Sequence, residues 1–322
     1  MKLFKTALIA ASVAMAGPAF AQQQLSIATG GTGGAYYPIG GGLAELINRH
    51  IDGYAAVAEV TGASVENVAL IHRGDSDIAI GLGDSVYQGF TGTGQFEGRQ
   101  AEGMRVLASV YPNAVQIVVP AESDIQSLED LRGKRVSVGA PGSGTELNAR
   151  ALLEAVGMTY DDLSAAQRLN FNETADALRD GDIDAGIWSV AAPASSIMNL
   201  TATRNIRLIP ITEEQVAASQ EIEPIFAAYT LQSGLYDGMA EDVPTVGIPN
   251  VWFVSEEMDE DLAYELTKML YDRHADLVAI HPAANDTSVE FTMGSSPVPL
   301  HAGALRYYEE VGADIPDNLR EQ

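Results

Sequence analysis

The sequence has no cysteine, few basic residues and, beyond Ala21, no apolar run long enough to cross a bilayer. The missing cysteine excludes disulfides, thiolate nucleophiles and cysteine-ligated zinc. Only 18 lysines and arginines stand against 44 aspartates and glutamates, which gives a net charge of −26 at pH 7. A field of this sign repels nucleic acid and anionic membrane surfaces, so we expect neither as a partner.

The segment from Met1 to Ala21 has the organisation of a secretory signal. Lys2 and Lys5 precede an apolar segment from Ala7 to Ala16, and Ala19-Phe20-Ala21 has the small-x-small pattern of a cleavage site. We therefore expect residues 1–21 to be a signal peptide and the remaining chain to be exported to the periplasm. The roughly 300 residues that remain suit two domains of ordinary size.

Apolar runs alternate with amphipathic segments along this remaining chain. The runs with the character of strands are Leu25–Ala28, Ala55–Val60, Ile78–Leu82, Val106–Val110, Val115–Val119, Val136–Gly139, Ile183–Trp188 and Ile206–Ile209. Between them, apolar residues recur at helical spacing, as at Ile39, Leu43 and Ile47. This alternation predicts an α/β fold with largely parallel sheets.

A glycine-rich turn from Thr29 to Gly42 follows the first strand, in the order strand, turn, helix. Its glycines, Gly30, Gly31, Gly33 and Gly34, can adopt backbone angles closed to other residues and let a ligand approach the main chain. Pro38 suits the first turn of a helix, and the free N–H groups at such a helix start attract anions. The alternative interpretation is a tight connection without a ligand.

A second strand, turn and helix unit lies in the middle of the chain, where Gly139 to Glu146 follow a short strand. Ser143 or Thr145 is expected to cap the helix and to offer a hydroxyl group to an anion. The spacing resembles a phosphate-binding loop, but Thr145 and Glu146 occupy the positions where that motif requires lysine and then serine or threonine. Nucleoside triphosphate binding is therefore not expected, and a plain capped helix is the alternative.

Four segments together resemble the TAXI family of TRAP-transporter solute-binding proteins: TGGTGGAYYPIGGGLA, VGAPGSGTELNARALLEAVG, DVPTVGIPNVWFV and PLHAGALRYYEEVG. The resemblance implies the two-lobed type II periplasmic binding protein architecture, or Venus flytrap. Residues 25–114 and 256–322 would form lobe 1, and residues 115–255 would form lobe 2. Val115–Val119 and Val251–Val254 would be the strands that cross between them.

The resemblance also implies a ligand site between the lobes. Its residues would be Thr32, Gly33, Gly34, Tyr37, Ser85, Gly142, Ser143, Gly144, Thr145, Trp188 and Ser189. The chain departs from the family at Gly83-Asp84-Ser85, where members more often have Gln-Ser-Asp, and after Trp188, where a second aromatic and glycines are usual. Trp188 and Tyr36 have a core position as their alternative, and Asp84 a helix cap.

The implied function is capture of a small carboxylate, such as glutamate, 2-oxoglutarate or a related dicarboxylate or amino acid, for an ion-gradient-driven TRAP permease. The receptor would be a monomer without cofactor or metal, and not an enzyme. The alternatives are a periplasmic sensor that docks on a signalling receptor, and an exported α/β hydrolase or isomerase.

Catalysis would need a titratable pair, and Asp84 with His72 is the one pair that the sequence suggests. The chain has no H-E-x-x-H or G-x-S-x-G motif, and Tyr36 occupies the last position of a G-x-G-x-x-G pattern. The aspartates at 75, 77 and 84 are close enough in sequence to suggest a calcium site, but in so acidic a chain chance explains their spacing better. The acidic segment from Thr212 to Glu223 is expected to be a solvated surface helix.

Overall fold

The structure is a computed structural model that describes residues 22–320, so the predicted signal peptide lies outside the described residues. The strands of this part are β1 (Gln23–Ala28), β2 (Tyr54–Glu59), β3 (Ile78–Leu82), β4 (Met104–Pro120), β5 (Arg135–Ser137), β6 (Ala165–Gln167), β7 (Ala185–Val190), β8 (Ile206–Ile209), β9 (Ala227–Leu231) and β10 (Val243–Ser255). They alternate with helices, as the sequence predicts.

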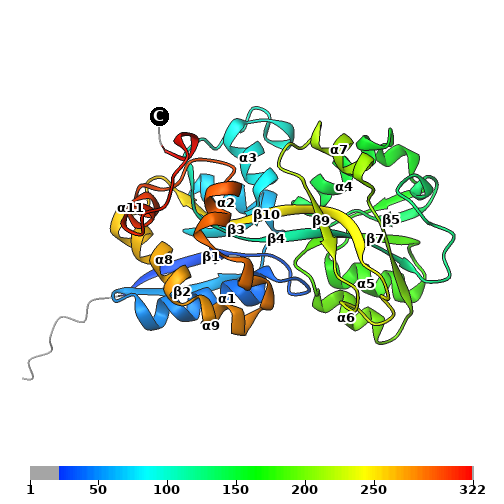
Figure 1. Cartoon of the computed structure of the whole chain (residues 1–322), viewed down its shortest axis with the longest axis horizontal. Coiled ribbons are helices and arrows are strands. Elements are labelled where there is room, and N and C mark those ends of the chain that lie inside the picture. The colour runs from blue at the N-terminus through cyan, green and yellow to red at the C-terminus, as the bar shows by residue number, and fades with distance from the viewer. Residues whose placement is uncertain (1–21, 321–322) are drawn as a thin grey trace, which may run out of the picture.

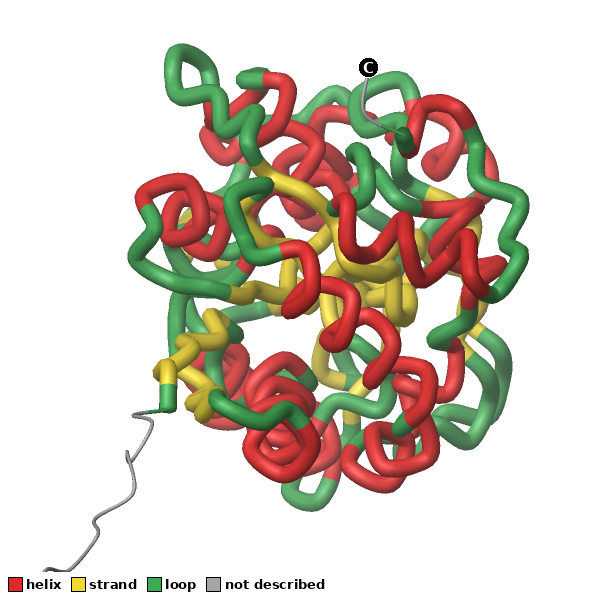
Figure 2. The backbone as a smooth tube through the Cα atoms, turned by 90° about the vertical axis from the view of Figure 1, so that its left-hand side faces the viewer, coloured by secondary structure: helices red, strands yellow, loops and turns green. Residues whose placement is uncertain are grey.

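The helices of the described residues lie on both sides of the strands (Figure 2). They are α1 (Tyr36–His50), α2 (Ser64–Arg73), α3 (Gly83–Thr91), α4 (Gly144–Ala155), α5 (Phe171–Asp180), α6 (Ser195–Thr201), α7 (Glu213–Gln220), α8 (Glu260–Asp272), α9 (His274–Ile280), α10 (Val289–Ser295) and α11 (Ala302–Glu310). None of the helices within residues 22–320 combines the length and the apolar character that a membrane crossing requires.

One mixed sheet runs through the molecule in the order β2-β1-β3-β10-β4-β7-β5-β6, with β8 beside β4 and β9 beside β10. The outer strands pair in parallel, whereas β10 pairs antiparallel with β3 and β4, and β4 pairs antiparallel with β7. The prediction of largely parallel sheets is therefore correct at both ends and wrong in the middle. The two strands expected at Val106–Val110 and Val115–Val119 are one strand, β4.

The long strands β4 and β10 cross from one half of the molecule to the other (Figure 1). One apolar core takes its buried residues mainly from Leu25–Tyr111 and Val251–Leu319, and two smaller cores take theirs mainly from Ala114–Ile248. We call these two parts lobe 1 and lobe 2. Val251–Val254, which the sequence assigned to lobe 2, pack in the core of lobe 1.

Asn250 holds the crossing strands together. Its amide nitrogen donates to the carbonyl oxygen of Tyr111 and to Oδ1 of Asn113, each at 2.9 Å, and its Oδ1 accepts from the hydroxyl of Tyr36. All four residues are buried. A fully satisfied polar group in a core fixes one arrangement of its neighbours, so this network sets how helix α1 meets both crossing strands.

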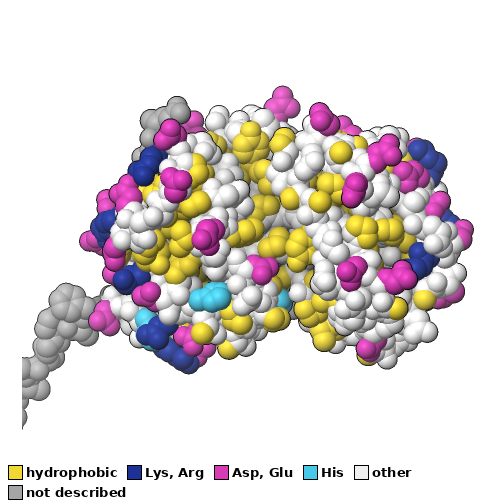
Figure 3. Space-filling view, viewed as in Figure 1, with side chains coloured by type: hydrophobic (Ala, Val, Ile, Leu, Met, Phe, Trp, Pro, Cys, Tyr) yellow, Lys and Arg dark blue, Asp and Glu magenta, His cyan; other side chains and the backbone are white. Residues whose placement is uncertain are grey.

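Acidic side chains are scattered over the face in Figure 3, and basic side chains gather toward its two ends. The acidic segment from Thr212 to Glu223 forms helix α7, as expected. Its last residue departs from the expectation, because Glu223 is only 9% exposed rather than solvated.

Candidate functional site

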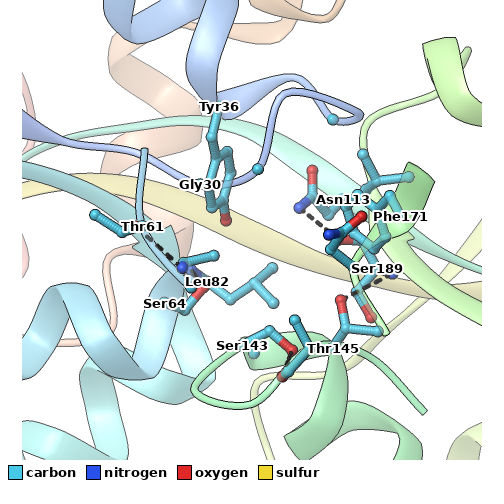
Figure 4. Close-up of a pocket in the computed structure, with 18 of the residues that line it drawn as sticks. Gly30, Tyr36, Thr61, Ser64, Leu82, Asn113, Ser143, Thr145, Phe171 and Ser189 are labelled. Atoms are coloured by element: carbon cyan, nitrogen blue, oxygen red, sulfur yellow. Dashed lines mark hydrogen bonds between the residues drawn. The ribbon is translucent and has the colours of Figure 1, made fainter. Parts of the chain in front are cut away.

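A cavity lies between the two lobes, at the end of the strands where several helices begin (Figure 4). The cavity has a volume of about 70 Å³ and is partly open to solvent. Lobe 1 supplies the turn before α1, the turn before α2 and Leu82 at the end of β3. Lobe 2 supplies the turn before α4, Phe171 at the start of α5 and the end of β7.

The first glycine turn closes one side of the cavity against lobe 2. Gly31 and Gly34 line the cavity, and a methyl group on Gly34 would lie 3.1 Å from the ring of Phe171. A methyl group on Gly33 would lie 2.5 Å from Oδ1 of Asn172. None of these glycines has a positive φ, so none of them uses the backbone freedom that glycine allows. Gly33 and Gly34 are needed because lobe 2 approaches the backbone closely at these two positions.

Two hydrogen bonds hold this turn to lobe 2. Nδ2 of Asn172 donates to Oγ1 of Thr32 at 3.4 Å, and Oγ of Ser195 donates to the carbonyl oxygen of Gly33 at 3.3 Å. Tyr36 lines the cavity, whereas Tyr37 is 38% exposed. The sequence favoured Tyr37 for the site and gave the core as the alternative for Tyr36. Tyr36 is indeed buried in the core of lobe 1, and it also lines the cavity. Adjacent residues of a helix point in directions about 100° apart, so one of the two faces the cavity and the other does not.

The turn before α2, Thr61 to Ser64, forms a further wall that the sequence did not predict. The first N–H groups of α2 are already bound across the lobe boundary, because those of Val65 and Glu66 both donate to the carbonyl oxygen of Gly142 at 3.1 Å. Gly142 has a φ of +77° and uses the left-handed region that favours glycine. A predicted ligand residue thus caps a helix of lobe 1 with its carbonyl.

The second turn borders the cavity at the start of α4, where the Ser143 hydroxyl donates to the carbonyl oxygen of Ala140 at 2.6 Å. Ser143 is the N-cap of α4, and its Oγ accepts from the N–H of Glu146 at 3.2 Å, as the sequence predicts. Gly144 and Thr145 also line the cavity, and Oγ1 of Thr145 accepts from the N–H of Ser189 at 3.4 Å. Ser189 is 4% exposed and its hydroxyl has no hydrogen-bond partner among the described residues.

Electrostatically, the described lining holds no lysine, arginine, histidine, aspartate or glutamate. Its polar groups are backbone amides, hydroxyls and the carboxamides of Asn113 and Asn170. The one titratable group is the phenol of Tyr36, and burial raises its pKa far above the ordinary value. The start of α4 adds the partial positive charge of its dipole. This arrangement is suited to bind an anion through N–H and O–H groups.

The acid–base pair that an enzyme would need is absent from this cavity. Asp84 is buried at the start of α3, whereas His72 is exposed at the end of α2. The aspartates at 75, 77 and 84 do not gather into a metal-binding group, since the described residues contain no group of three or more potential metal-binding side chains. Asp75 instead pairs with Arg73, and Asp77 accepts from Ser26.

Several predicted ligand residues do not reach the cavity. Ser85 is fully buried, and its hydroxyl donates to Asp84 at 3.3 Å. Trp188 is 0% exposed, stacks on Phe171 with the ring centres 6.3 Å apart, and donates its indole N–H to Ser196. Successive side chains of a strand point to opposite faces. Trp188 faces the core, and the next residue, Ser189, therefore faces the cavity. Thr32, Gly33 and Gly142 contact the opposite lobe, as described above.

The structure adds residues that the sequence did not single out. They are Thr61 to Ser64, Leu82, Asn113, Ala140, Asn170, Phe171 and Val190. The turn before α2 had a detectable signal, because Thr61-Gly62-Ala63-Ser64 also connects a strand to a helix. Asn113 had none, since its position depends on how β4 crosses between the lobes.

Three solved structures of similar fold have 11–16% sequence identity to this chain. The binding protein of a Pseudomonas aeruginosa ABC phosphonate transporter has a TM-score of 0.54 and 11% identity, over 83% of this chain and 82% of the other. A Xanthomonas citri protein bound to ATP has a TM-score of 0.52 and 14% identity, over 90% and 100%. A putative L-cystine ABC transporter protein from Listeria monocytogenes has a TM-score of 0.51 and 16% identity, over 83% and 98%.

These likenesses bear on the fold alone, and they confirm the predicted type II periplasmic binding protein architecture. The sequence itself matches a family description over residues 27–312, which is nearly the whole described chain. On that match, this protein is a member of the NMT1-like family.

Proposed function

We propose that this protein is an exported solute-binding receptor that closes its two lobes around a small carboxylate, such as 2-oxoglutarate, glutamate or a related organic acid. The receptor then delivers the solute to a membrane permease. It acts in the periplasm as a monomer, without a cofactor and without catalysis. The similar structures from Pseudomonas and Listeria are named as parts of transporters, which supports a transport role.

The hydroxyl of Ser189 carries this proposal. A buried hydroxyl without a partner is costly unless something binds it, and this one lies beside the start of α4. One carboxylate oxygen accepts from Ser189 and the other from the free N–H groups of Gly144 and Thr145. Holding the anion without lysine or arginine keeps release to the permease possible.

For the partner we propose the TRAP permease that the resemblance to the TAXI family implies. The four sequence segments that resemble the TAXI family support this choice of partner, and the segment with the second turn contributes Ser143, Gly144 and Thr145 to the cavity. An ABC permease is the competing partner, because two of the similar structures are named as ABC components. Co-expression of the receptor with each permease type, followed by uptake of the bound acid under an imposed ion gradient or with ATP, separates the two.

Calorimetric titration tests the receptor function. Residues 22–322 are unfolded, stripped of retained solute, refolded and titrated with C4 to C6 dicarboxylates and amino acids. We expect one-to-one binding of one acid, and a loss of about 1–3 kcal/mol of binding free energy in Ser189→Ala. Folding stability should hardly change, since this hydroxyl makes no bond in the protein.

Thr203→Ala is the control, because it removes a hydroxyl from an exposed residue just after α6, outside the cavity lining, where it donates to the carbonyl oxygen of Leu200. Its affinity should equal that of the unmodified protein. Absence of heat with every acid would reject the small carboxylate. Binding that is equally strong in Ser189→Ala would reject the placement of the anion.

A further inference from the structure

A second contact between the lobes lies outside the cavity lining, on helix α3. Asp84 and Gln88 stand one turn apart on this helix of lobe 1, and both reach across to lobe 2. Nδ2 of Asn148, in α4, donates to Oδ2 of Asp84. Nε2 of Gln88 donates to Oε1 of Glu223 at 2.5 Å. All four side chains are buried, so the junction consists of two carboxyl–carboxamide pairs removed from water.

Among residues 22–320, no cation contributes to the electrostatics of either carboxyl. The titratable groups that act on Glu223 are Asp84 and Glu154 of α4, and burial together with the charge of Asp84 raises the pKa of Tyr36 in α1. Within residues 22–320, neither carboxyl belongs to an ion pair. Burial raises the pKa of Asp84 to about 6, and burial together with the charge of Asp84 raises the pKa of Glu223 to about 7.

The two carboxamide oxygens of the junction lack hydrogen-bond donors. Oδ1 of Asn148 and Oε1 of Gln88 are both buried without a hydrogen-bond donor. An ionised carboxylate only accepts hydrogen bonds and leaves these oxygens unsatisfied. A protonated carboxyl has an O–H group to donate, and in each pair the carboxamide oxygen is the acceptor that lacks a donor. Oδ1 of Asp84 also accepts from the N–H of Ser85 at 2.6 Å. One proton per pair would supply the donor that each carboxamide oxygen lacks.

We propose that lobe closure takes up protons on Asp84 and Glu223, so that each stands in the closed form as a neutral acid hydrogen-bonded to its carboxamide partner. This proposal rests on the proposed function, because it concerns how the receptor opens and closes around its solute. It makes the α3 junction a pH-dependent latch between the lobes. The closed receptor is favoured in acid, and a rise in pH opens it and releases the solute.

The direction of the pH dependence follows from the protonation of the two carboxyls in the open and closed forms. In the open form both carboxyls face water and have ordinary pKa values of about 4. In the closed form the values are higher, so the closed form binds more protons at a pH between the two sets. Closure therefore weakens as the pH rises from about 4 through 7, by up to about tenfold per pH unit for each carboxyl. Above that range both states are ionised and the dependence ends.

Distance measurements between spin labels test the latch without any solute. Because the chain has no cysteine, Asp52→Cys after α1 and Glu214→Cys in α7 give two unique exposed sites, one in each lobe. We expect the ratio of closed to open molecules to rise at least about tenfold between pH 8 and pH 5. In Asp84→Asn with Glu223→Gln, which always carry a neutral group, the ratio should be high and change less than about twofold.

Glu221→Gln is the matched control, because it removes the same charge from a nearby exposed position. It should respond to pH as the unmodified protein does. A thermal melt at pH 8 shows whether the double variant folds, and we expect it to melt no lower than the unmodified protein. A ratio independent of pH in the unmodified protein, or a double variant with undiminished pH dependence, would overturn the latch.

The outcome is independent of the ligand assignment. If no acid binds in the calorimetric titration while the label distances still change with pH, the proposed solute is wrong and the latch stands. If an acid binds with an affinity that is the same at pH 5 and pH 8, the receptor function stands and the latch is wrong.

Discussion

The two glycine-rich turns have similar sequences and work differently. In the turn before α1, the glycines have ordinary backbone angles and are small because lobe 2 packs against them at Gly33 and Gly34. In the turn before α4, Gly139 and Gly142 have φ values of +99° and +77°, and the glycines shape the turn itself. The first turn therefore serves the contact between lobes, and the second serves the donors that it presents to the cavity. Glycine content alone does not distinguish the two roles.

The largest effect should come from enlarging the first turn. In Gly33→Val the new side chain would collide with Asn172 and Phe171, which belong to the other lobe. We expect solute binding to weaken by about 3 kcal/mol while the melting temperature stays near that of the unmodified protein. Gly41→Ala in α1 is the control, since nothing lies within 4 Å of the added methyl group and Gly41 is outside the cavity lining. Equal binding by the two variants would show that the turn does not close on lobe 2.

Removing the hydroxyls of the second turn should weaken binding without preventing closure. Ser143→Ala with Thr145→Ala removes two groups of the cavity wall, and we expect a loss of about 1–3 kcal/mol in binding measured by calorimetry. The loss of the Ser143 cap should also reduce stability by about 1 kcal/mol in denaturant unfolding. Unchanged affinity would contradict the anion site at the start of α4.

Strain in the second turn gives the next effect. Gly139→Ala forces a side chain into positive φ and places it 2.8 Å from Cβ of Thr145. We expect unfolding by denaturant to become easier by about 2 kcal/mol. Gly157→Ala shares the positive φ but meets no atom within 4 Å, so it should cost only about 1 kcal/mol. Equal costs would mean that the turn relaxes around Thr145.

The smallest expected effect is a difference in stability between the variants Tyr36→Phe and Tyr37→Phe. Tyr36→Phe removes the hydrogen bond to Asn250 and leaves a buried acceptor unpaired, so stability should fall by about 1–2 kcal/mol. Tyr37→Phe removes an exposed hydroxyl and should change stability by less than about 0.5 kcal/mol. Chemical denaturation of both variants checks the difference, and the reverse order would place Tyr37 at the crossing strands.

Local sequence was enough to predict what depends on neighbouring residues. The strand–helix alternation, the strands β1, β3 and β8, and the Ser143 cap follow from periodicity and capping, which act over a few residues. The resemblance supplied the two-lobed architecture. Side chains of a strand alternate between its two faces. The sequence therefore already implied that only one of Trp188 and Ser189 can face the cavity.

What the sequence could not supply depends on how the lobes meet. Nothing local to Gly142 indicates that its carbonyl caps α2, which belongs to a distant segment of the chain. The burial of Glu223 has the same origin, since an acidic surface segment becomes a lobe contact only when α3 packs against it. The antiparallel centre of the sheet likewise follows from the long crossing strands β4 and β10, which local periodicity does not reveal.

A crystal structure of residues 22–322 with the acid that binds best in calorimetry tests the central claim most directly. The account predicts one carboxylate within hydrogen-bond distance of the Ser189 hydroxyl and of the N–H groups of Gly144 and Thr145, with Gly142 still bound to α2. An acid bound elsewhere, or one held in the cavity without contact to Ser189 and the start of α4, would contradict it.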